Sequence, residues 1–255
     1  MASDTKTLIR VSNLSKVYKK DKELVHALKK VSLELKAQES AALVGESGSG
    51  KSTLAKIILG LERPSSGAAY CFEEELYKLS APQARPVYKK VQAVFQNPVK
   101  SFNPRHTIAY SFKKHMQNLG YERDKITERS KEVMELCQLD PSFLKRYPHE
   151  VSIGQCQRAA IARALSTRPE VLICDEATSA LDVSVQAQIV KLLKELKQDC
   201  RLSLLFISHD IALVSEIAES IHVMHEGCIV ESAKTQDIIS HPQDNYTKAL
   251  ISAVL

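Results

Sequence analysis

The feature that most constrains this chain is the stretch GESGSGKS, residues 45 to 52. It fits the pattern G-x-x-x-x-G-K-[S/T] at every fixed position, after a short apolar run and before a helix-like segment. In such a strand–loop–helix setting the glycines let the backbone curl, so that several N–H groups point at phosphate oxygens. A glycine- and serine-rich loop with a chance lysine is the alternative. The complete pattern in its setting favours binding of a nucleoside triphosphate.

Three consecutive residues at the end of this loop have expected partners in bound Mg-nucleotide. Lys51 can reach the β- and γ-phosphates, Ser52 can ligate Mg²⁺, and Thr53 can contact the α-phosphate. The predicted nucleotide-binding residues of the loop are Gly45, Glu46, Ser47, Gly48, Ser49, Gly50, Lys51, Ser52 and Thr53.

The stretch VLICDEA, residues 171 to 177, supplies a second candidate cluster. Its apolar residues predict a buried strand that delivers Asp175 and Glu176 to the carboxyl edge of a sheet, where ligands of open α/β sheets bind. We expect Asp175 to hold the Mg²⁺ shell and Glu176 to polarise a water for in-line attack on the γ-phosphate. An acidic helix cap after a strand is the alternative, and the upstream phosphate loop favours the catalytic interpretation.

The stretch LLFISHD repeats this design, with His209 directly after an apolar run. A histidine after a strand is often structural. Here it follows the next strand after the acidic pair, where a donor to the γ-phosphate is needed, so we predict a functional role for His209.

Hydrophobic periodicity predicts an α/β protein with a mostly parallel, covered sheet. The segment from about 103 to 165 has the pattern of apolar and polar residues that is typical of helices. We therefore expect a single domain over residues 1–255, with a core and β subdomain at 1–96 and 166–255 and a helical subdomain at about 97–165. The expected strands are 7–14, 25–36, 40–45, 67–72, 90–95, 171–174, 202–207 and a pair within 220–232, and the expected helices include 127–139, 183–198 and 210–219.

Composition and charge exclude several classes of protein. The net charge of +5 comes from 35 basic and 30 acidic residues that are interleaved, without a basic stripe that contains aromatics, so nucleic-acid binding is not expected. The six cysteines are scattered singly, which favours reduced thiols over a metal site. No leader is expected, and no apolar run approaches the about 18 residues of a membrane span.

The stretch VSIGQ, residues 151 to 155, opens an amphipathic run rich in alanine, isoleucine and arginine. Ser152 can cap the helix that follows, and Gly154 permits a close backbone approach. Together with the phosphate loop, Gln96, the acidic pair, SALD at 179–182 and His209, this ordered set resembles the nucleotide-binding subunit of ATP-binding cassette (ABC) transporters. The resemblance runs along essentially the whole chain.

This resemblance implies a P-loop NTPase fold with a RecA-like core, an antiparallel β subdomain and an inserted helical signature subdomain. It also implies a head-to-tail dimer that holds two ATP molecules, each between one phosphate loop and the signature residues Ser152, Gly154 and Gln155 of the other subunit. Tyr18 falls where the family places an aromatic ring on adenine, although it could equally be an edge-strand tyrosine. Gln96 resembles the residue that links Mg²⁺ and the attacking water to the membrane subunit, and Asp182 resembles the dimer-contact aspartate.

A narrower resemblance concerns the segment FQNPVKSFNPRHT and the tail HPQDNYTKALISAVL. Two Asn-Pro pairs predict a rigid surface loop, because proline disfavours helix in the residue before it. Both segments are similar to the peptide and nickel importer branch. The implied function is an ATPase that energises import of peptides, nickel or metal chelates. The implied partners are a second ATPase subunit, two transmembrane permease subunits and an extracytoplasmic substrate-binding protein, and the implied location is the cytoplasmic face of the cell membrane.

Ile153 departs from the family pattern Leu-Ser-Gly-Gly-Gln, which has glycine at that position. A β-branched residue there would be strained by about 1–3 kcal/mol if φ is positive, and hardly strained if φ is negative. The hypothesis is a heterodimer with one slower site. A soluble ABC ATPase without a transport role and a catalytically silent scaffold subunit are the alternatives. Ala37-Gln38 and Ala233 also replace turn glycines of the family.

Overall fold

The computed structural model describes residues 6–20, 23–179 and 181–253. Ala180 of the SALD stretch and the last two residues of the tail lie outside the described residues. The chain divides into two compact units. The first unit runs up to Val87 and resumes at Ser203, and the second is Tyr88–Leu202.

The first unit contains a four-stranded antiparallel sheet in the order β2-β1-β4-β5. One face of β2 is buried from Leu28 onward, in the alternating pattern of a half-buried strand, with Leu33 and Leu35 inside. The strands of this sheet are β1 (Thr7–Lys20), β2 (Glu23–Lys36), β4 (Ser66–Cys71) and β5 (Glu74–Glu75).

A second sheet of the first unit runs in the order β10-β9-β3-β8. β3 (Ser40–Val44) pairs parallel with both β8 (Ser203–Ser208) and β9 (Ser220–His225), and β10 (Cys228–Lys234) adds an antiparallel edge. Every residue of β3 and β8 is buried, as expected for parallel strands covered on both faces. The helix α1 (Lys51–Ile58) follows β3 and buries Leu54 and Ile57 completely.

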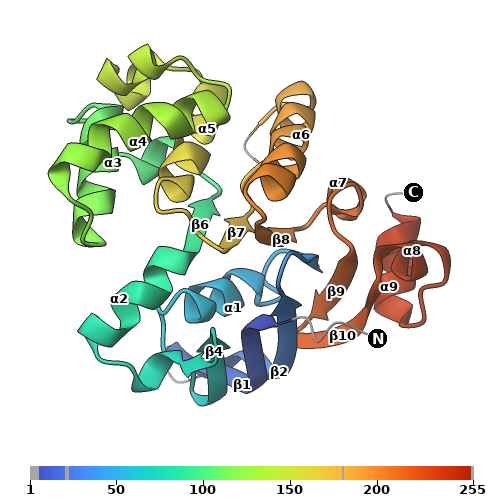
Figure 1. Ribbon diagram of the computed structural model, residues 1–255. Helices are drawn as coiled ribbons and strands as arrows, with labels where there is room; N and C mark the ends of the chain where they lie inside the picture. The colour runs from blue at the N-terminus through green and yellow to red at the C-terminus, as the bar shows by residue number, and fades with distance from the viewer. Residues whose placement is uncertain (1–5, 21–22, 180, 254–255) are drawn as a thin grey trace. The chain divides into compact units, whose positions relative to one another are not determined.

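The second unit combines a parallel strand pair with a group of helices. β6 (Val91–Phe95) pairs with β7 (Val171–Asp175), and α5 contacts both β6 and α6. The helices α3, α4 and α5 lie together in the helical part of this unit (Figure 1). The α-helices are α3 (Ile108–Asn118), α4 (Arg123–Leu136), α5 (Ile153–Leu165) and α6 (Val183–Asp199).

This unit is larger than the helical subdomain predicted at 97–165. It begins at Tyr88 and ends at Leu202 because β6 and β7 pair with each other and α5 packs on β6. The remaining elements of the chain are α2 (Ala81–Lys90), α7 (Ile211–Ser215), α8 (Thr235–Ser240), α9 (Asn245–Ser252), and the 3₁₀ turns η1 (Leu76–Lys78), η2 (Val99–Ser101), η3 (Pro141–Lys145) and η4 (Pro148–Glu150).

Most predicted elements are confirmed, and the differences have local causes. The helix predicted at 210–219 is shorter, because α7 ends at Ser215 and the chain then turns before β9. The helix α2 was not predicted, since Pro86 lies inside it and proline normally interrupts a helix.

The two glycine replacements noted in the sequence have different outcomes. Gln38 has φ 62°, in the left-handed region that glycine favours, and its N–H donates to Ser203 Oγ at 2.7 Å. This hydrogen bond offsets part of the backbone strain. Ala233 instead pairs with Ile221 inside the β9–β10 ladder, where a side chain is accommodated.

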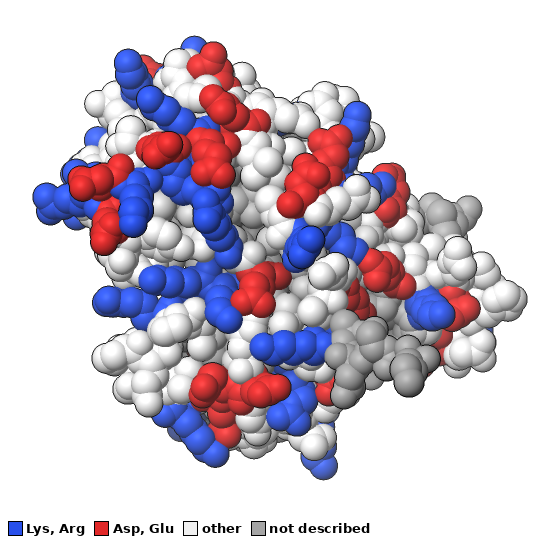
Figure 2. Space-filling model, in the orientation of Figure 1, with Lys and Arg blue, Asp and Glu red and all other residues white. Residues whose placement is uncertain are grey.

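Two surface properties of the described residues bear on function. No helix among them has the length and apolar character needed to cross a bilayer. On the face shown in Figure 2, basic and acidic side chains alternate over the surface, as the interleaved sequence predicted.

Candidate nucleotide-binding site

The phosphate-loop segment lies between β3 and α1, and it wraps around the ammonium group of Lys51. Lys51 Nζ donates to the carbonyl oxygens of Gly45 at 2.6 Å and Glu46 at 2.7 Å, and lies 3.3 Å from Ser49 Oγ. The lysine is only 4% exposed, although Glu46 and Gly48 are exposed. A positive charge is therefore held on the concave side of a loop whose rim is open to solvent, which suits a polyphosphate.

Glycine is required in this loop for two different reasons. At Gly45, with φ 153°, a Cβ would lie 2.0 Å from the carbonyl oxygen of Met224, so a side chain is excluded by the neighbouring strand. At Gly48, with φ 85°, a Cβ would meet nothing within 4 Å, so only the left-handed backbone demands glycine there. The loop is thus packed on one side against β9 and open at Gly48.

His209 lies beside the phosphate loop, because of strand register in the first unit. β3 and β8 are parallel neighbours, and Val44 pairs with Ser208. Gly45 and His209 therefore follow adjacent strands at the same edge of the sheet. The turn after His209 is fixed by Asp210, whose carboxylate accepts the Leu213 N–H at 3.0 Å and caps α7.

Tyr18 lies on β1, and its hydroxyl is hydrogen-bonded to the side chains of Glu62 and Thr53. Burial and the hydrogen bond to Glu62 raise the pKa of Tyr18 above its usual value. Lys16, two residues earlier on the strand, places Nζ 5.0 Å from the centre of the Tyr18 ring. Since Thr53 is a predicted α-phosphate contact, the ring is held next to the loop. Its contact with adenine stays a prediction.

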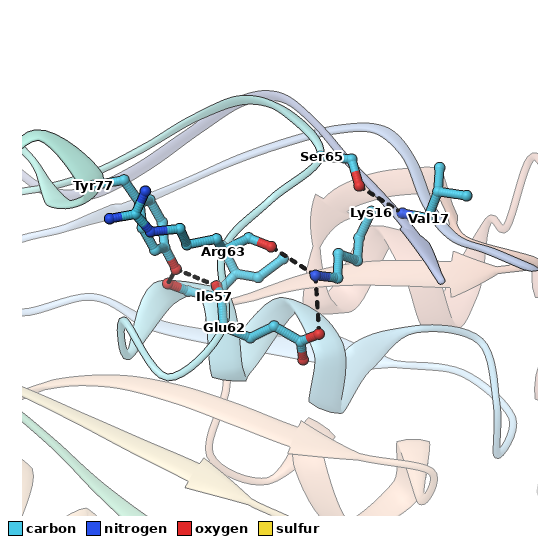
Figure 3. A network of polar contacts seen from close by, with 7 residues as sticks. All are labelled: Lys16, Val17, Ile57, Glu62, Arg63, Ser65 and Tyr77. Atoms are coloured by element: carbon cyan, nitrogen blue, oxygen red, sulfur yellow. Dashed lines mark hydrogen bonds and ion pairs between the residues drawn. The ribbon is translucent and has the colours of Figure 1, made fainter. Parts of the chain in front are cut away.

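The two residues before Tyr18 on β1 are held by the segment after α1, as Figure 3 shows for Lys16 and Val17. Lys16 Nζ lies 3.0 Å from Glu62 Oε1 and donates to the carbonyl of Arg63 at 2.8 Å, while the Val17 N–H donates to Ser65 Oγ at 2.9 Å. Burial raises the pKa of Glu62, but the hydrogen bonds from Tyr18 and Lys16 outweigh it and hold this pKa below the usual range. The carboxylate therefore stays charged and holds both partners.

Gln96, Asp175 and Glu176 meet at one edge of the strand pair in the second unit. β6 and β7 are parallel, and Phe95 pairs with Asp175. Gln96 therefore follows β6 just as Glu176 follows β7. Asp175 is 8% exposed, whereas Gln96 is exposed. The strand register therefore brings these three positions to the same sheet edge, and their roles with metal, base and water stay predictions.

Glu176 has a backbone conformation that the sequence did not predict. Its φ is 48°, in the left-handed region, where a non-glycine residue is strained by about 1 kcal/mol or more. Its carbonyl accepts hydrogen bonds from the N–H of Ser179 at 3.2 Å and from Ser179 Oγ at 3.1 Å. The buried strand β7 thus ends in a tight turn that begins at Glu176, the predicted base.

The predicted signature residues form the start of α5. Ser152 is the N-cap and accepts the Gln155 N–H at 3.2 Å, while Gln155 Oε1 accepts the Ser152 N–H at 3.0 Å. This reciprocal pair is a capping box, so the predicted cap is confirmed and Gln155 is part of it. A Cβ at Gly154 would lie 2.9 Å from Val185 Cγ1 of α6, so a residue with a side chain would require Val185 to shift.

Ile153 is the first residue of α5 and has an ordinary helical backbone, so the strained alternative does not apply. Its side chain is 51% exposed. It lines a cavity of about 230 Å³ together with residues 97–100, the segment that follows Gln96. The extra side chain therefore affects the surface at the helix start rather than the backbone.

Asp182 caps α6, as its carboxylate accepts the Val185 N–H at 3.0 Å and the Ser184 hydroxyl at 2.7 Å. These hydrogen bonds hold the pKa of Asp182 below its usual range. Its predicted role as a dimer contact stays a prediction.

The predicted Mg²⁺ ligands are divided between the two units, and their role in holding the metal stays a prediction. Ser52 offers an exposed hydroxyl on the first turn of α1, and Asp175 offers a buried carboxylate at the end of β7. The described residues contain no group of three or more His, Cys, Asp or Glu side chains that could cage a metal. Few protein ligands, all oxygens, suit a Mg²⁺ ion that shares its shell with phosphates and water.

Two contributors to the site were missed in the sequence. Glu62 holds Tyr18, and Gly227 of the β9–β10 turn donates its N–H to the Ser49 carbonyl at 3.0 Å. Both act across long stretches of sequence and carry no local pattern. The dipeptide Glu226-Gly227 between two apolar runs predicts a turn but not its contact with the phosphate loop.

Comparisons with known proteins agree with this geometry. Residues 28–179 match the ABC transporter family. The oligopeptide transport ATP-binding protein OppF of Haemophilus influenzae is 41% identical, over 100% of this chain and 80% of that protein. OppF of Escherichia coli is 42% identical over 88% of this chain and 68% of that protein.

Solved structures give the same result for the fold. A dimeric ATP-binding cassette in a post-hydrolysis state with ADP and Pi is similar with a TM-score of 0.80 and 29% identity, over 89% of this chain and 99% of that one. A cassette of an ABC transporter complex from Clostridium perfringens is similar with a TM-score of 0.80 and 26% identity, over 92% and 91%. With its phosphate loop, acidic strand end and capped signature helix, this chain belongs to the ABC transporter family and is an ATP-hydrolysing cassette of the P-loop fold.

Proposed function

We propose that this chain energises an importer for peptides, working as a head-to-tail dimer that docks on two transmembrane permease subunits. The observation that carries the proposal is the strand register of each unit. It sets Gln96 beside Asp175 and Glu176 in one unit, and His209 beside the phosphate loop in the other. The names of the OppF relatives support peptides as cargo, and nickel or metal chelates are the alternative cargo.

The proposed reaction is hydrolysis of ATP by in-line attack of water on the γ-phosphorus. Glu176 accepts a proton from the water while the water oxygen bonds to phosphorus, and ADP leaves with the electrons of the broken bond. Lys51 and His209 stabilise the negative charge on the transferred group. Ser52, Gln96 and Asp175 would hold a Mg²⁺ ion, which would neutralise charge on the phosphates.

The proposed dimer couples ATP binding and hydrolysis to transport. Ser152, Gly154 and Gln155 of one subunit contact the ATP of the other, and Asp182 contacts the partner subunit. The segment after Gln96 passes the motion to the permease, and an extracytoplasmic binding protein delivers the cargo. This places the subunit peripherally on the cytoplasmic face of the cell membrane. Because each nucleotide contributes a modest coupling free energy, closure relies on both.

The test separates binding from chemistry in the purified chain. Lys51→Ala should abolish measurable binding of MgATP in calorimetry, because the loop loses its cation. Glu176→Gln should keep the affinity for MgATP but lower turnover in the paired complex by about 100-fold or more.

Glu75→Gln is the matched control, since its carboxylate lies 2.7 Å from Lys78 Nζ in a surface ion pair on a different strand. Undiminished affinity for MgATP in the Lys51→Ala protein would overturn the proposal.

A second candidate, a low-activity partner in an asymmetric heterodimer, is favoured by Ile153. Its half-exposed side chain stands at the helix start where the family has glycine. In the head-to-tail arrangement this residue faces the ATP of the partner, so the slower site is the one built on the other subunit's phosphate loop.

A further inference from the structure

Tyr246, in the C-terminal helix α9, reaches the phosphate loop directly. Its hydroxyl oxygen accepts a hydrogen bond from the backbone N–H of Glu46 at 3.0 Å. The two residues are 200 positions apart in the sequence, yet both belong to the first unit.

The backbone of Glu46 forms hydrogen bonds with both Tyr246 and the ammonium group of Lys51. Its N–H is held by the tyrosine, while its carbonyl oxygen accepts Lys51 Nζ at 2.7 Å and the Ser49 N–H at 3.2 Å. A rotation of this residue would move the carbonyl that holds the ammonium group. The position of the Lys51 charge therefore depends on the Gly45–Glu46 peptide, because Tyr246 accepts its N–H and its other end, the Gly45 carbonyl, accepts Lys51 Nζ at 2.6 Å.

The ring of Tyr246 is itself held in place. It stacks on His225 at the end of β9, with ring centres 3.9 Å apart and planes at 24°. α8 and α9 lie beside β10 in the first unit (Figure 1). Because one face of the ring is fixed, the hydroxyl has a defined position.

The start of α9 is anchored by a carboxylate of β10. Glu231 accepts the N–H of Gln243 at 2.9 Å and the N–H of Asp244 at 3.0 Å, and Asp244 in turn caps the helix by accepting the Tyr246 N–H at 2.8 Å. Burial raises the pKa of Glu231, but these hydrogen bonds outweigh it and keep the pKa below the usual range. The anchor is therefore charged at neutral pH.

The Tyr246 hydroxyl is in the protonation state that suits its hydrogen bond with the Glu46 N–H. Burial raises the pKa of Tyr246 above its usual value, so the hydroxyl is neutral at physiological pH. A neutral hydroxyl has two lone pairs and one proton, and it accepts from Glu46 while its proton stays available.

We propose that Tyr246 is a positioning residue of the nucleotide site: by holding the Glu46 N–H, it sets the loop peptide that places the Lys51 ammonium for the phosphates of ATP. The tail helix α9 is thereby part of the nucleotide site. This inference rests on the assignment of the Gly45–Thr53 segment as the phosphate-binding loop.

The experiment compares three ligands on the full chain. The affinities for MgATP, MgADP and magnesium tripolyphosphate are measured by isothermal titration calorimetry in the wild-type protein and in Tyr246→Phe, which keeps the ring on His225 and loses only the hydroxyl. The substitution should weaken all three ligands by the same factor, about 3- to 10-fold, because one neutral hydrogen bond is removed and the defect lies at the phosphates.

Tyr70→Phe is the matched control. Tyr70 lies on β4 in a cavity lined by no residue of the phosphate loop, so the affinities should not change. Tyr18→Ala provides the opposite pattern, since loss of base stacking should weaken ATP and ADP but spare tripolyphosphate. Lys51→Ala tests the loop assignment itself in the same assay.

Two outcomes overturn the inference. One is unchanged affinity for all three ligands in Tyr246→Phe while Lys51→Ala abolishes binding, which leaves the loop assignment intact. The other is a loss confined to ATP and ADP, which would assign Tyr246 to the base.

A double-mutant cycle with Glu231→Gln distinguishes positioning from general stability. Loosening the anchor should weaken tripolyphosphate binding in the wild-type background but add little in Tyr246→Phe, because both changes act through the same hydroxyl. A merely structural role would lower the melting temperature in both backgrounds and give additive or absent effects on affinity, which contradicts the proposal.

Discussion

Neighbouring residues at the start of α5 obey different constraints. A methyl group at Gly154 would press against Val185 at 2.9 Å, whereas the side chain of Ile153 is half exposed and has a helical backbone. A bulky residue is therefore accepted at one position and would displace Val185 at the next, although the family has glycine at both. The reason is the distance to α6 and not the backbone angle.

His115 on α3 provides a prediction about pH. Its Nε2 atom is buried with no hydrogen-bond partner among the described residues, and burial followed by the charge of Arg163 lowers the pKa to about 4. The unfolded chain has the ordinary value near 6.5, so as the pH falls it takes up a proton before the folded chain does. The free energy of unfolding should be insensitive to this group above about 6.5 and fall between 6.5 and 4, by about 3 kcal/mol in all.

Urea unfolding at pH 7.5 and 5.0 measures this effect. His115→Leu should show a drop about 2 kcal/mol smaller than wild type between these two pH values. Equal drops in the two proteins would mean that the imidazole is solvated in the folded state.

At the scale of elements, α5 is tied to the segment after Gln96. Arg163 Nη1 donates to the Ser101 carbonyl at 2.7 Å and to Ser111 Oγ at 2.8 Å, and the guanidinium lies 4.4 Å from the centre of the Phe102 ring. One side chain thus joins the signature helix to η2 and to α3. The segment predicted to contact the permease is held by the helix predicted to contact ATP.

Arg163→Met should free this segment. The substitution removes two hydrogen bonds and takes this donor from the partly buried Ser101 carbonyl, so the free energy of unfolding should fall by about 2–3 kcal/mol. Hydrogen exchange followed by mass spectrometry should show faster exchange at 97–107.

Arg105→Met is the control on the same segment, because this arginine is exposed. Unaltered exchange in Arg163→Met would show that the segment is held by other contacts.

At the scale of the whole molecule, the two units carry different parts of the chemistry. The first unit holds the phosphate loop, Tyr18 and His209, and the second holds Gln96, the acidic pair and the signature helix. Both sets are needed for hydrolysis in the proposed function. The partner cassette would contribute a second copy of each.

Ile153→Gly is the prediction at this scale. In a complex with a second cassette that has the glycine-containing signature, the substitution should raise ATP turnover by up to about tenfold, which corresponds to about 1.4 kcal/mol in the barrier. The physical reason is removal of a branched side chain from the helix start that is predicted to face the partner's nucleotide.

Val99→Ala is the control, since Val99 lines the same cavity outside the signature. Steady-state phosphate release measures the effect. Unchanged turnover in Ile153→Gly would contradict the hypothesis of one slower ATP site.

The sequence alone determined the local chemistry. The phosphate loop, the acidic strand end and the serine cap of α5 are each encoded within about ten residues, and apolar periodicity determined most strands and helices. Such features are readable because a strand end, a cap or a glycine turn depends on neighbours in the chain.

Only the tertiary structure decided the contacts across long stretches of sequence. The register of β3 with β8 brings His209 to the loop, and Glu62 and Tyr246 support the site from distant segments. A hydroxyl and an N–H that are 200 residues apart have no shared local pattern, since their meeting depends on how strands pair and helices pack. The same holds for the left-handed Glu176, whose conformation is imposed by the turn around it.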